Sequence, residues 1–218
     1  MKKINKEELR NLILSGITSE ELNSKYDYSH IEDMSELFWG CEELTTLPKL
    51  LTKNVKNFKS AFQMCYNLSS IEGIDTSSAE HVDRMFFECV MLETMPKLNF
   101  KNVITANRAF SACHSLKHIP QLECSNLKEA DWMFLNCVKL TTVSMLNTDN
   151  VENFYGTFCG CSNLEYVHNI NMNSAKRTSH MFSGCHSLRN INPYDYPSGE
   201  WGNFENEWIE KHYPELYL

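Results

Sequence analysis

Cysteine is the residue whose type and spacing could carry chemistry in this chain. Seven of the nine cysteines recur at an interval of 24 residues, and only Cys124 and Cys159 stand outside the series. The members of the series are Cys41, Cys65, Cys89, Cys113, Cys137, Cys161 and Cys185. A zinc site gathers four ligands around one point, usually with cysteine pairs two to four residues apart, and the chain has one such pair, Cys159 and Cys161. The spacing therefore predicts thiols that pack as small apolar side chains, and no metal site.

Histidine gives no stronger indication of catalysis. His114 and His186 occupy the same place in the 24-residue period, but they lie three periods apart and are too distant to share a metal. Cys159 and His180 could form a nucleophile and base pair, although nothing in their spacing requires it. The eight glycines form no phosphate-binding loop. We predict a protein that is not an enzyme and that has no catalytic residue, metal or cofactor.

The same interval governs the apolar residues around each cysteine. Phenylalanine lies three residues before it, at Phe38, Phe62, Phe86, Phe110, Phe134, Phe158 and Phe182. Leucine lies three residues after it, at Leu44, Leu68, Leu92, Leu116, Leu140, Leu164 and Leu188. Such unbroken columns indicate repeats that bury one shared core only when they are stacked.

Each repeat is predicted to hold one short helix and one short strand. Met34, Leu37, Phe38 and Cys41 are three or four residues apart, which places them on one face of a helix. The stretch 44–47 reads as a strand of about three residues, and the proline that follows it cannot donate to a ladder. The predicted fold is an α/β solenoid, a leucine-rich-repeat-like stack of seven 24-residue repeats.

A polar column precedes the predicted helices. Its members are Asn54, Ser78, Asn102, Asn126, Asn150 and Ser174. Asparagine and serine suit a helix N-cap, because their side chains accept bonds from unpaired backbone N–H groups. A stack of them could equally bond one repeat to the next, and the sequence leaves both roles open.

We divide the chain into three parts. Residues 1–32 read as an N-terminal helical cap, 33–192 as the seven-repeat solenoid, and 193–218 as an acidic, aromatic C-terminal cap. The formal net charge is −8, and the last part carries six acids against one base. An acidic total argues against nucleic acid as a partner.

Location is inferred from what the sequence lacks. No stretch approaches the roughly 18 apolar residues of a membrane span, and the first residues do not resemble a signal peptide. We therefore expect no membrane association and a cytoplasmic location, in a bacterium or a phage-infected host cell. Nine cysteines in that compartment are expected to be reduced.

The repeat unit resembles the BspA-like leucine-rich repeat family, known from bacterial and protist surface proteins and from phage genomes. The resemblance rests on the unit formed by Asn150, Val151, Phe154, Phe158, Cys161, Leu164 and Val167, and it covers about 33–192. It implies the repeat fold and no shared active site. Short members without a secretion signal look like phage or bacterial accessory proteins.

The leading functional hypothesis is a non-enzymatic module that binds a protein partner in the cytosol. One alternative is a phage-encoded inhibitor that blocks a bacterial defence protein, and a second is an adhesin-like surface protein. Candidate contact residues are large side chains on predicted exposed columns and in the last segment. They are Trp39, Phe87, Val90, Trp132 and Leu135 of the helix columns, His118, Tyr166 and His168 of the strand columns, and Trp201 and Trp208.

Overall fold

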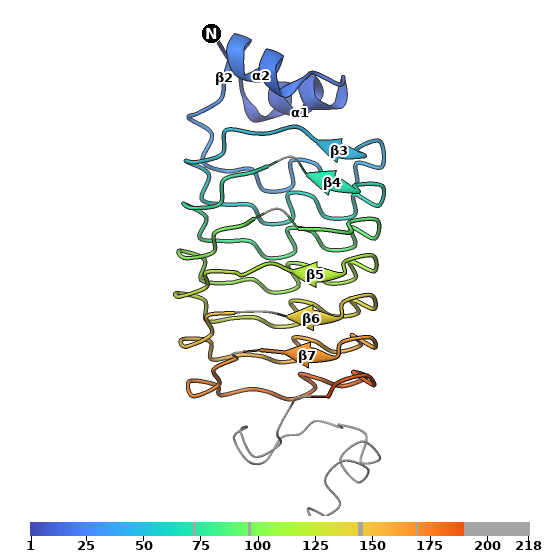
Figure 1. Ribbon diagram of the computed structural model, residues 1–218. Coiled ribbons are helices and arrows are strands. Elements are labelled where there is room, and N and C mark those ends of the chain that lie inside the picture. Colours follow the sequence, from blue (N-terminus) through green and yellow to red (C-terminus); the bar gives the residue numbers. More distant parts are fainter. Residues whose placement is uncertain (72, 96, 144–145, 169, 190–218) are drawn as a thin grey trace, which may run out of the picture.

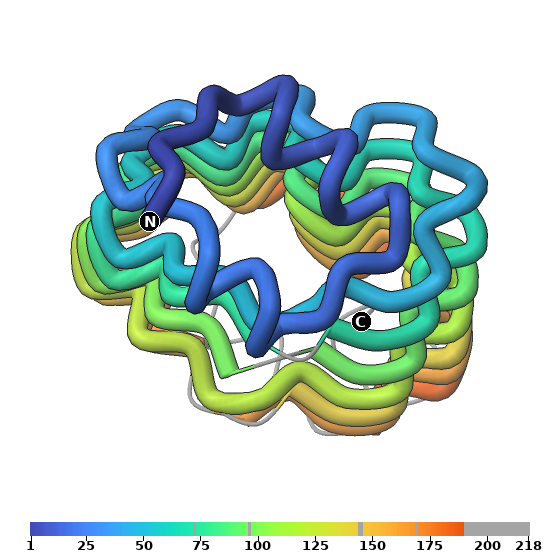
Figure 2. Tube along the Cα trace, turned by 90° about the horizontal axis from the view of Figure 1, so that it is seen from above, coloured from blue at the N-terminus to red at the C-terminus, as the bar shows by residue number. Residues whose placement is uncertain are grey.

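The protein is a straight stack of similar coils with two helices at its N-terminal end (Figure 1). The computed structural model describes residues 1–71, 73–95, 97–143, 146–168 and 170–189. Viewed along the stack, successive coils superpose, so equivalent residues of neighbouring repeats lie one above another (Figure 2). The predicted C-terminal cap, 193–218, lies outside the described residues.

The N-terminal segment contains β1 (Lys2–Lys3), α1 (Lys6–Leu14), α2 (Ser19–Lys25) and β2 (Tyr26–Asp27), and β1 pairs with β2 in parallel. Asn5 begins α1 because its side chain accepts from the Glu8 backbone N–H, while the Glu8 carboxylate accepts from the Asn5 backbone N–H. The apolar side of α1, with Leu9 and Ile13, is buried in the same core as the repeats.

The strands of the repeats are short and parallel. They are β3 (Thr46–Leu47), β4 (Ser70–Ile71), β5 (His118–Ile119), β6 (Thr142–Val143) and β7 (Tyr166–Val167). β3 pairs with β4, and β5, β6 and β7 form a second sheet, always between residues 24 apart. β3 and β5 end directly before Pro48 and Pro120, as predicted, although each strand has two residues and not three.

The predicted helix in each repeat is wrong. None of the described repeats contains a helix, and the segment before each cysteine is a series of turns. Its backbone enters the left-handed region twice, five residues and one residue before the cysteine, with φ of 58° at Glu36 and 67° at Gly40. Left-handed residues cannot continue a right-handed helix, so the i to i−4 bonding never starts.

The backbone hydrogen bonds explain why turns replace the helix. Alternate N–H groups donate to the next repeat, as Glu36 N does to Lys59 O at 2.9 Å and Phe38 N does to Ala61 O at 2.8 Å. The N–H groups between them close local turns, as Cys41 N does to Phe38 O at 3.0 Å. Every second bond therefore holds two coils together, which a helix with only internal bonds could not do.

The core is built from the predicted columns. Neighbouring rings of the phenylalanine column stack at 5.2–5.5 Å between centroids with interplanar angles of 3–18°. All seven cysteines of the column are buried. From the second repeat on, each thiol donates to the carbonyl of the phenylalanine 27 residues earlier, as Cys113 Sγ does to Phe86 O at 3.1 Å.

The polar column bonds one repeat to the next, which settles the choice that the sequence left open. The side-chain amides of Asn54, Asn102 and Asn150 donate to backbone carbonyls 25 residues earlier, at 2.7–2.8 Å. Ser174 Oγ makes the equivalent bond to Asp149 O at 2.6 Å. These side chains begin no helix, because their repeats have none.

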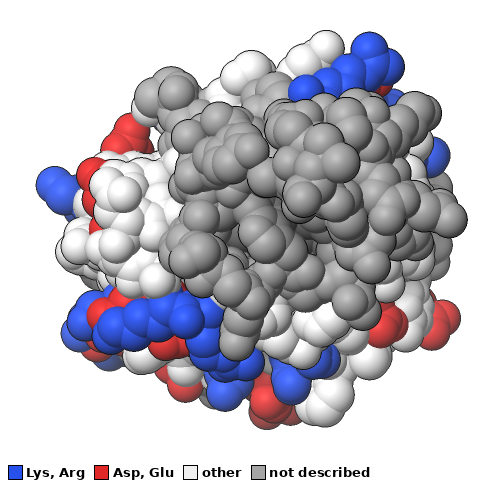
Figure 3. Space-filling model, turned by 90° about the horizontal axis from the view of Figure 1, so that it is seen from below, with Lys and Arg blue, Asp and Glu red and all other residues white. Residues whose placement is uncertain are grey.

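Charged side chains also pair along the stack. Lys56, Lys117 and Lys176 each contact a glutamate 24 residues earlier, at 2.8, 2.7 and 2.6 Å. Seen from the C-terminal end, acidic and basic side chains lie next to each other around the rim (Figure 3). These pairs are well exposed, so each contributes about 0–1 kcal/mol.

Candidate protein-binding surface

One outer column of the turns combines a fixed backbone with varied side chains. The residue five before each cysteine is left-handed, with φ between 54° and 62° in all seven repeats. We call it the left-handed column; it contains Glu36, Ser60, Arg84, Arg108, Trp132, Gly156 and His180. Because the backbone conformation is the same, the side chains leave equivalent coils in the same direction. The column thus presents a row of chemically different groups along the stack.

Aromatic and cationic side chains meet in repeats five to seven of this column. Trp132 packs edge-on against Tyr155, with ring centroids 4.9 Å apart and an interplanar angle of 87°. Tyr155 packs in the same way against His180 at 5.5 Å, and the Arg177 guanidinium lies 4.8 Å from its ring centre. We call Trp132, Tyr155, Arg177 and His180 the Trp132 cluster. Three of them are half-buried and Arg177 is exposed, so the group is both held in place and accessible.

Gly156 makes room for the tryptophan. A Cβ atom at this position would lie 2.2 Å from Cε3 of the Trp132 ring. Six of the seven repeats carry a side chain in the left-handed column, so the backbone conformation alone does not demand glycine there. Glycine is needed at 156 because the ring of the preceding repeat covers it.

An acidic group lies beneath the cluster. Asp131 Oδ1 is buried without a hydrogen bond, and its other oxygen is 4.0 Å from Arg177 Nη1. Burial raises the pKa of the Asp131 carboxyl, and the positive charge of Arg177 opposes that shift. Arg177 therefore contacts both an aromatic ring and a poorly solvated carboxylate.

Comparison with known families follows the repeat architecture. A profile described as a BspA type leucine rich repeat region, in six copies, matches residues 82–196. The chain belongs to the BspA-type leucine-rich repeat family. A second profile, described as a Mycoplasma protein of unknown function, matches residues 8–121. Leucine-rich repeat modules generally bind proteins, and the family indicates a protein-binding module.

Solved structures support the fold of this BspA-type chain. A leucine-rich repeat protein of T. pallidum is 25% identical, with a TM-score of 0.55, over 72% of this chain and 70% of that one. A leucine-rich repeat protein of Bacteroides ovatus is 18% identical over 75% and 70% of the two chains, with a TM-score of 0.26. Among curated proteins, none matches the chain.

The residues predicted from the helix columns separate into two places. Trp132 lies in the left-handed column, whereas Phe87, Val90 and Leu135 are half-buried at the neighbouring corner of the BspA-type coil. Trp39, at the N-terminal end of that corner, is 51% exposed. The expected apolar patch is thus partly covered by its own repeats.

The strand columns form a separate surface. His118 and His168 are exposed and Tyr166 is half-buried, and the Tyr166 and His168 rings stack at 6.0 Å. Hydroxyl groups of Thr46, Ser70, Thr94 and Thr142 precede them in the column. Trp201 and Trp208 lie outside the described residues.

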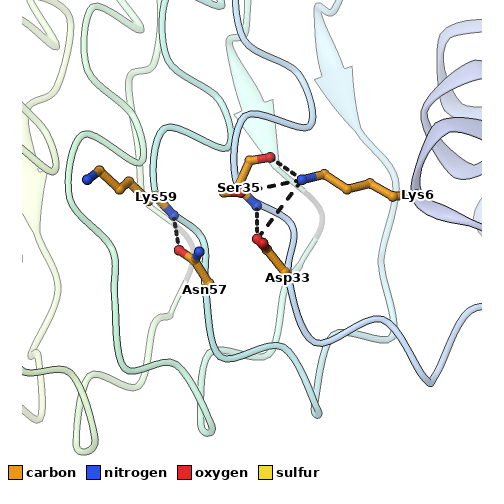
Figure 4. A network of polar contacts seen from close by, with 5 residues as sticks. All are labelled: Lys6, Asp33, Ser35, Asn57 and Lys59. Atoms are coloured by element: carbon orange, nitrogen blue, oxygen red, sulfur yellow. Dashed lines mark hydrogen bonds and ion pairs between the residues drawn. The ribbon is translucent and has the colours of Figure 1, made fainter.

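The N-terminal end holds a polar network that completes the stack. Lys6 Nζ donates to the Ser35 carbonyl and lies 4.0 Å from Asp33 Oδ1, which accepts from Ser35 N at 2.7 Å (Figure 4). In the next repeat, Glu36 N donates to the equivalent Lys59 carbonyl. Lys6 therefore takes the place of a missing repeat at the first coil.

A hollow of about 350 Å³ lies beside this network, with Glu7, Arg10 and Glu36 among its lining residues. Arg10 Nη2 contacts Cys41 Sγ at 2.8 Å, at the open end of the thiol column. Both cations are thus engaged with the first repeat. We interpret this region as a structural cap.

The thiols are poorly suited to chemistry. Burial raises the pKa of Cys65 to about 12, and it raises the pKa of Cys159 as well. A protonated thiol is a weak nucleophile and a weak metal ligand. Among the described residues, no group of three or more His, Cys, Asp or Glu side chains could hold a metal ion.

Sequence analysis missed Tyr155 and Arg177, and it named His180 only as a possible partner of Cys159. The ring of His180 instead packs on Tyr155. A local signal existed: Gly156 is the one glycine in the left-handed column, directly after an aromatic residue and 24 residues after Trp132.

Proposed function

We propose that this chain is a non-enzymatic protein-binding module whose contact surface is centred on the Trp132 cluster. The observation that carries the proposal is the preorganised packing of Trp132, Tyr155 and Arg177, described above. Tryptophan, tyrosine and arginine are the residues that most often dominate binding energy at protein interfaces. Fixing them before binding reduces the side-chain entropy lost on association.

The cluster has the exposure that an interface centre requires. Half-buried rings keep part of their surface for a partner and rest on their own repeats for support. The strand surface, by contrast, is mainly small hydroxyl groups, and the corner with Phe87 and Leu135 is covered in part. The Trp132 cluster is therefore the stronger candidate of the three surfaces.

We further propose that the module acts in a reducing compartment such as the cytoplasm. Support comes from the nine cysteines, all of which are free thiols. No helix among the described residues is long and apolar enough to cross a membrane. The narrower roles, an inhibitor encoded by a phage or an adhesin, remain predictions, as does the exclusion of nucleic acid.

Two tryptophan variants test the contact surface. Purified chain is used to capture partners from a lysate of the source cell, and the captured protein is then purified and its Kd measured directly. Trp132→Ala is expected to weaken binding by at least about 30-fold, as expected for a residue at an interface centre. Trp39→Ala removes an exposed tryptophan elsewhere and is expected to leave the Kd within about threefold. Equal affinity for the wild type and Trp132→Ala would refute the proposed surface.

A further inference from the structure

The left-handed column carries two adjacent arginines beside the Trp132 cluster. Arg84, Arg108 and Trp132 belong to three consecutive repeats, with φ of 54°, 57° and 55°. Neighbouring coils are bonded in parallel, so these positions are roughly 4.8 Å apart along the stack. We call Arg84 and Arg108 the arginine pair. It extends the cluster towards the middle of the molecule.

The arginine pair forms no ion pair with the described residues, unlike the lysines at 56, 117 and 176. The nearest acid in sequence is already used. Asp83 accepts from Thr105 Oγ1 at 2.7 Å and from Asn107 N at 2.9 Å. Arg84 is exposed and Arg108 half-buried, so two guanidinium groups remain open to a partner.

The acids beneath the cluster are also occupied. Glu129 accepts from Asn153 Nδ2 at 2.9 Å, and Asp131 faces Arg177. The positive groups therefore project from the column, while the negative groups are turned to internal bonds. At the other end of the column the residues are Glu36 and Ser60, so the positive charge is confined to repeats three and four.

We propose that the arginine pair binds carboxylates of an acidic segment in the protein partner, while Trp132 contacts an aromatic or aliphatic side chain of the same segment. This inference rests on the proposed function and names the chemistry of its partner. Guanidinium groups bind carboxylates through two parallel hydrogen bonds. Side chains two residues apart in an extended peptide are about 6.6 Å apart, within reach of two flexible arginines one coil apart.

Charge favours a peptide over a nucleic acid. A phosphate backbone needs a long track of cations, whereas the column offers two arginines between a glutamate and an aromatic cluster that includes Asp131. The net charge of −8 would repel a uniform polyanion. An acidic segment interrupted by an apolar residue matches the column better.

The test is selection from a displayed library of random 12-residue peptides, followed by fluorescence polarisation with the strongest peptide. Selected peptides are expected to be enriched in Asp and Glu close to Phe, Trp, Tyr or Leu. Arg84→Glu/Arg108→Glu is expected to weaken binding at least 30-fold, and Arg84→Gln/Arg108→Gln about tenfold. Exchanging the peptide's acids for lysines is expected to restore binding to the glutamate variant, which a misfolded protein could not do.

The matched control is Lys53→Glu/Lys101→Glu. It makes the same change in net charge at two exposed residues of another turn, and it is expected to change the Kd less than threefold. Equal losses in both charge-reversed variants would overturn the inference, as would a single-stranded 20-nucleotide DNA that binds more tightly than the peptide.

Separate outcomes distinguish this inference from the proposed function. Peptides that need Trp132 but carry no acids would overturn the acidic partner and leave the binding surface standing. Peptides that bind independently of Trp132, or a failure to select any peptide, would count against both.

Discussion

Replacing Gly156 with alanine should destabilise the protein more than any ordinary glycine substitution at positive φ. Two costs add at this position. An alanine with φ of 62° loses roughly 1 kcal/mol in the left-handed region. Its Cβ would also lie 2.2 Å from Trp132 Cε3, so the ring or the coil must move. Overpacking of this kind costs about 1–3 kcal/mol, which gives about 2–4 kcal/mol in total.

Gly40 supplies the matched control. Its φ is 67°, and a Cβ added there meets no atom within 4 Å. Gly40→Ala therefore carries only the backbone cost and should destabilise by about 1 kcal/mol. Both variants are measured by urea unfolding monitored by circular dichroism, with identical conditions and protein concentration.

A double-mutant cycle isolates the contact between ring and glycine. If the ring is the obstacle, Trp132→Ala/Gly156→Ala should cost less than the sum of its single changes by about 1–2 kcal/mol. Equal costs for Gly40→Ala and Gly156→Ala, or strict additivity in the cycle, would refute the placement of Trp132 over Gly156. The same Gly156→Ala variant should weaken partner binding, because it displaces the centre of the proposed surface.

Three further predictions concern the core and the cluster. Phe110→Ala opens a cavity between stacked rings at 5.5 and 5.4 Å and should cost about 3–5 kcal/mol in urea unfolding; a cost under 1 kcal/mol would contradict the continuous ladder. Iodoacetamide at pH 8, followed by mass spectrometry, should modify half-buried Cys159 before buried Cys113, whose pKa burial raises further; the reverse order would show that the column opens to water. Burial raises the folded pKa of Asp131, so its contribution is fully present below the unfolded pKa of about 3.9 and is lost as pH rises through the folded value. Asp131→Asn should therefore gain Tm relative to the wild type between pH 4 and pH 7, and an unchanged difference would show that the carboxylate is well solvated.

The candidate site shows the limit of residue-type reasoning. Trp132 is identifiable in the sequence as a large apolar residue at an outer position. Its partners are not, because Tyr155, Arg177 and His180 come from the next two repeats at different places in the period. Only the stacking of coils brings those places together.

The sequence by itself determined the period, the columns of the core and the end of each strand. A strict 24-residue recurrence of Phe, Cys and Leu has one economical solution, in which each column lines up along a common axis and excludes water. Proline after β3 and β5 stops the ladder for a purely local reason, the missing N–H group.

Tertiary structure alone decided the backbone between the strands. Met34, Leu37, Phe38 and Cys41 have helical spacing, but a chain of turns with left-handed residues buries the same four side chains. Sequence periodicity reports which side chains face the core and not where the N–H groups go. A helix would bond only to itself, whereas the stacked coil offers a carbonyl on the next repeat to every second N–H. That choice exists only when a neighbouring coil is present, and it also fixes the left-handed column from which the arginine pair and Trp132 project.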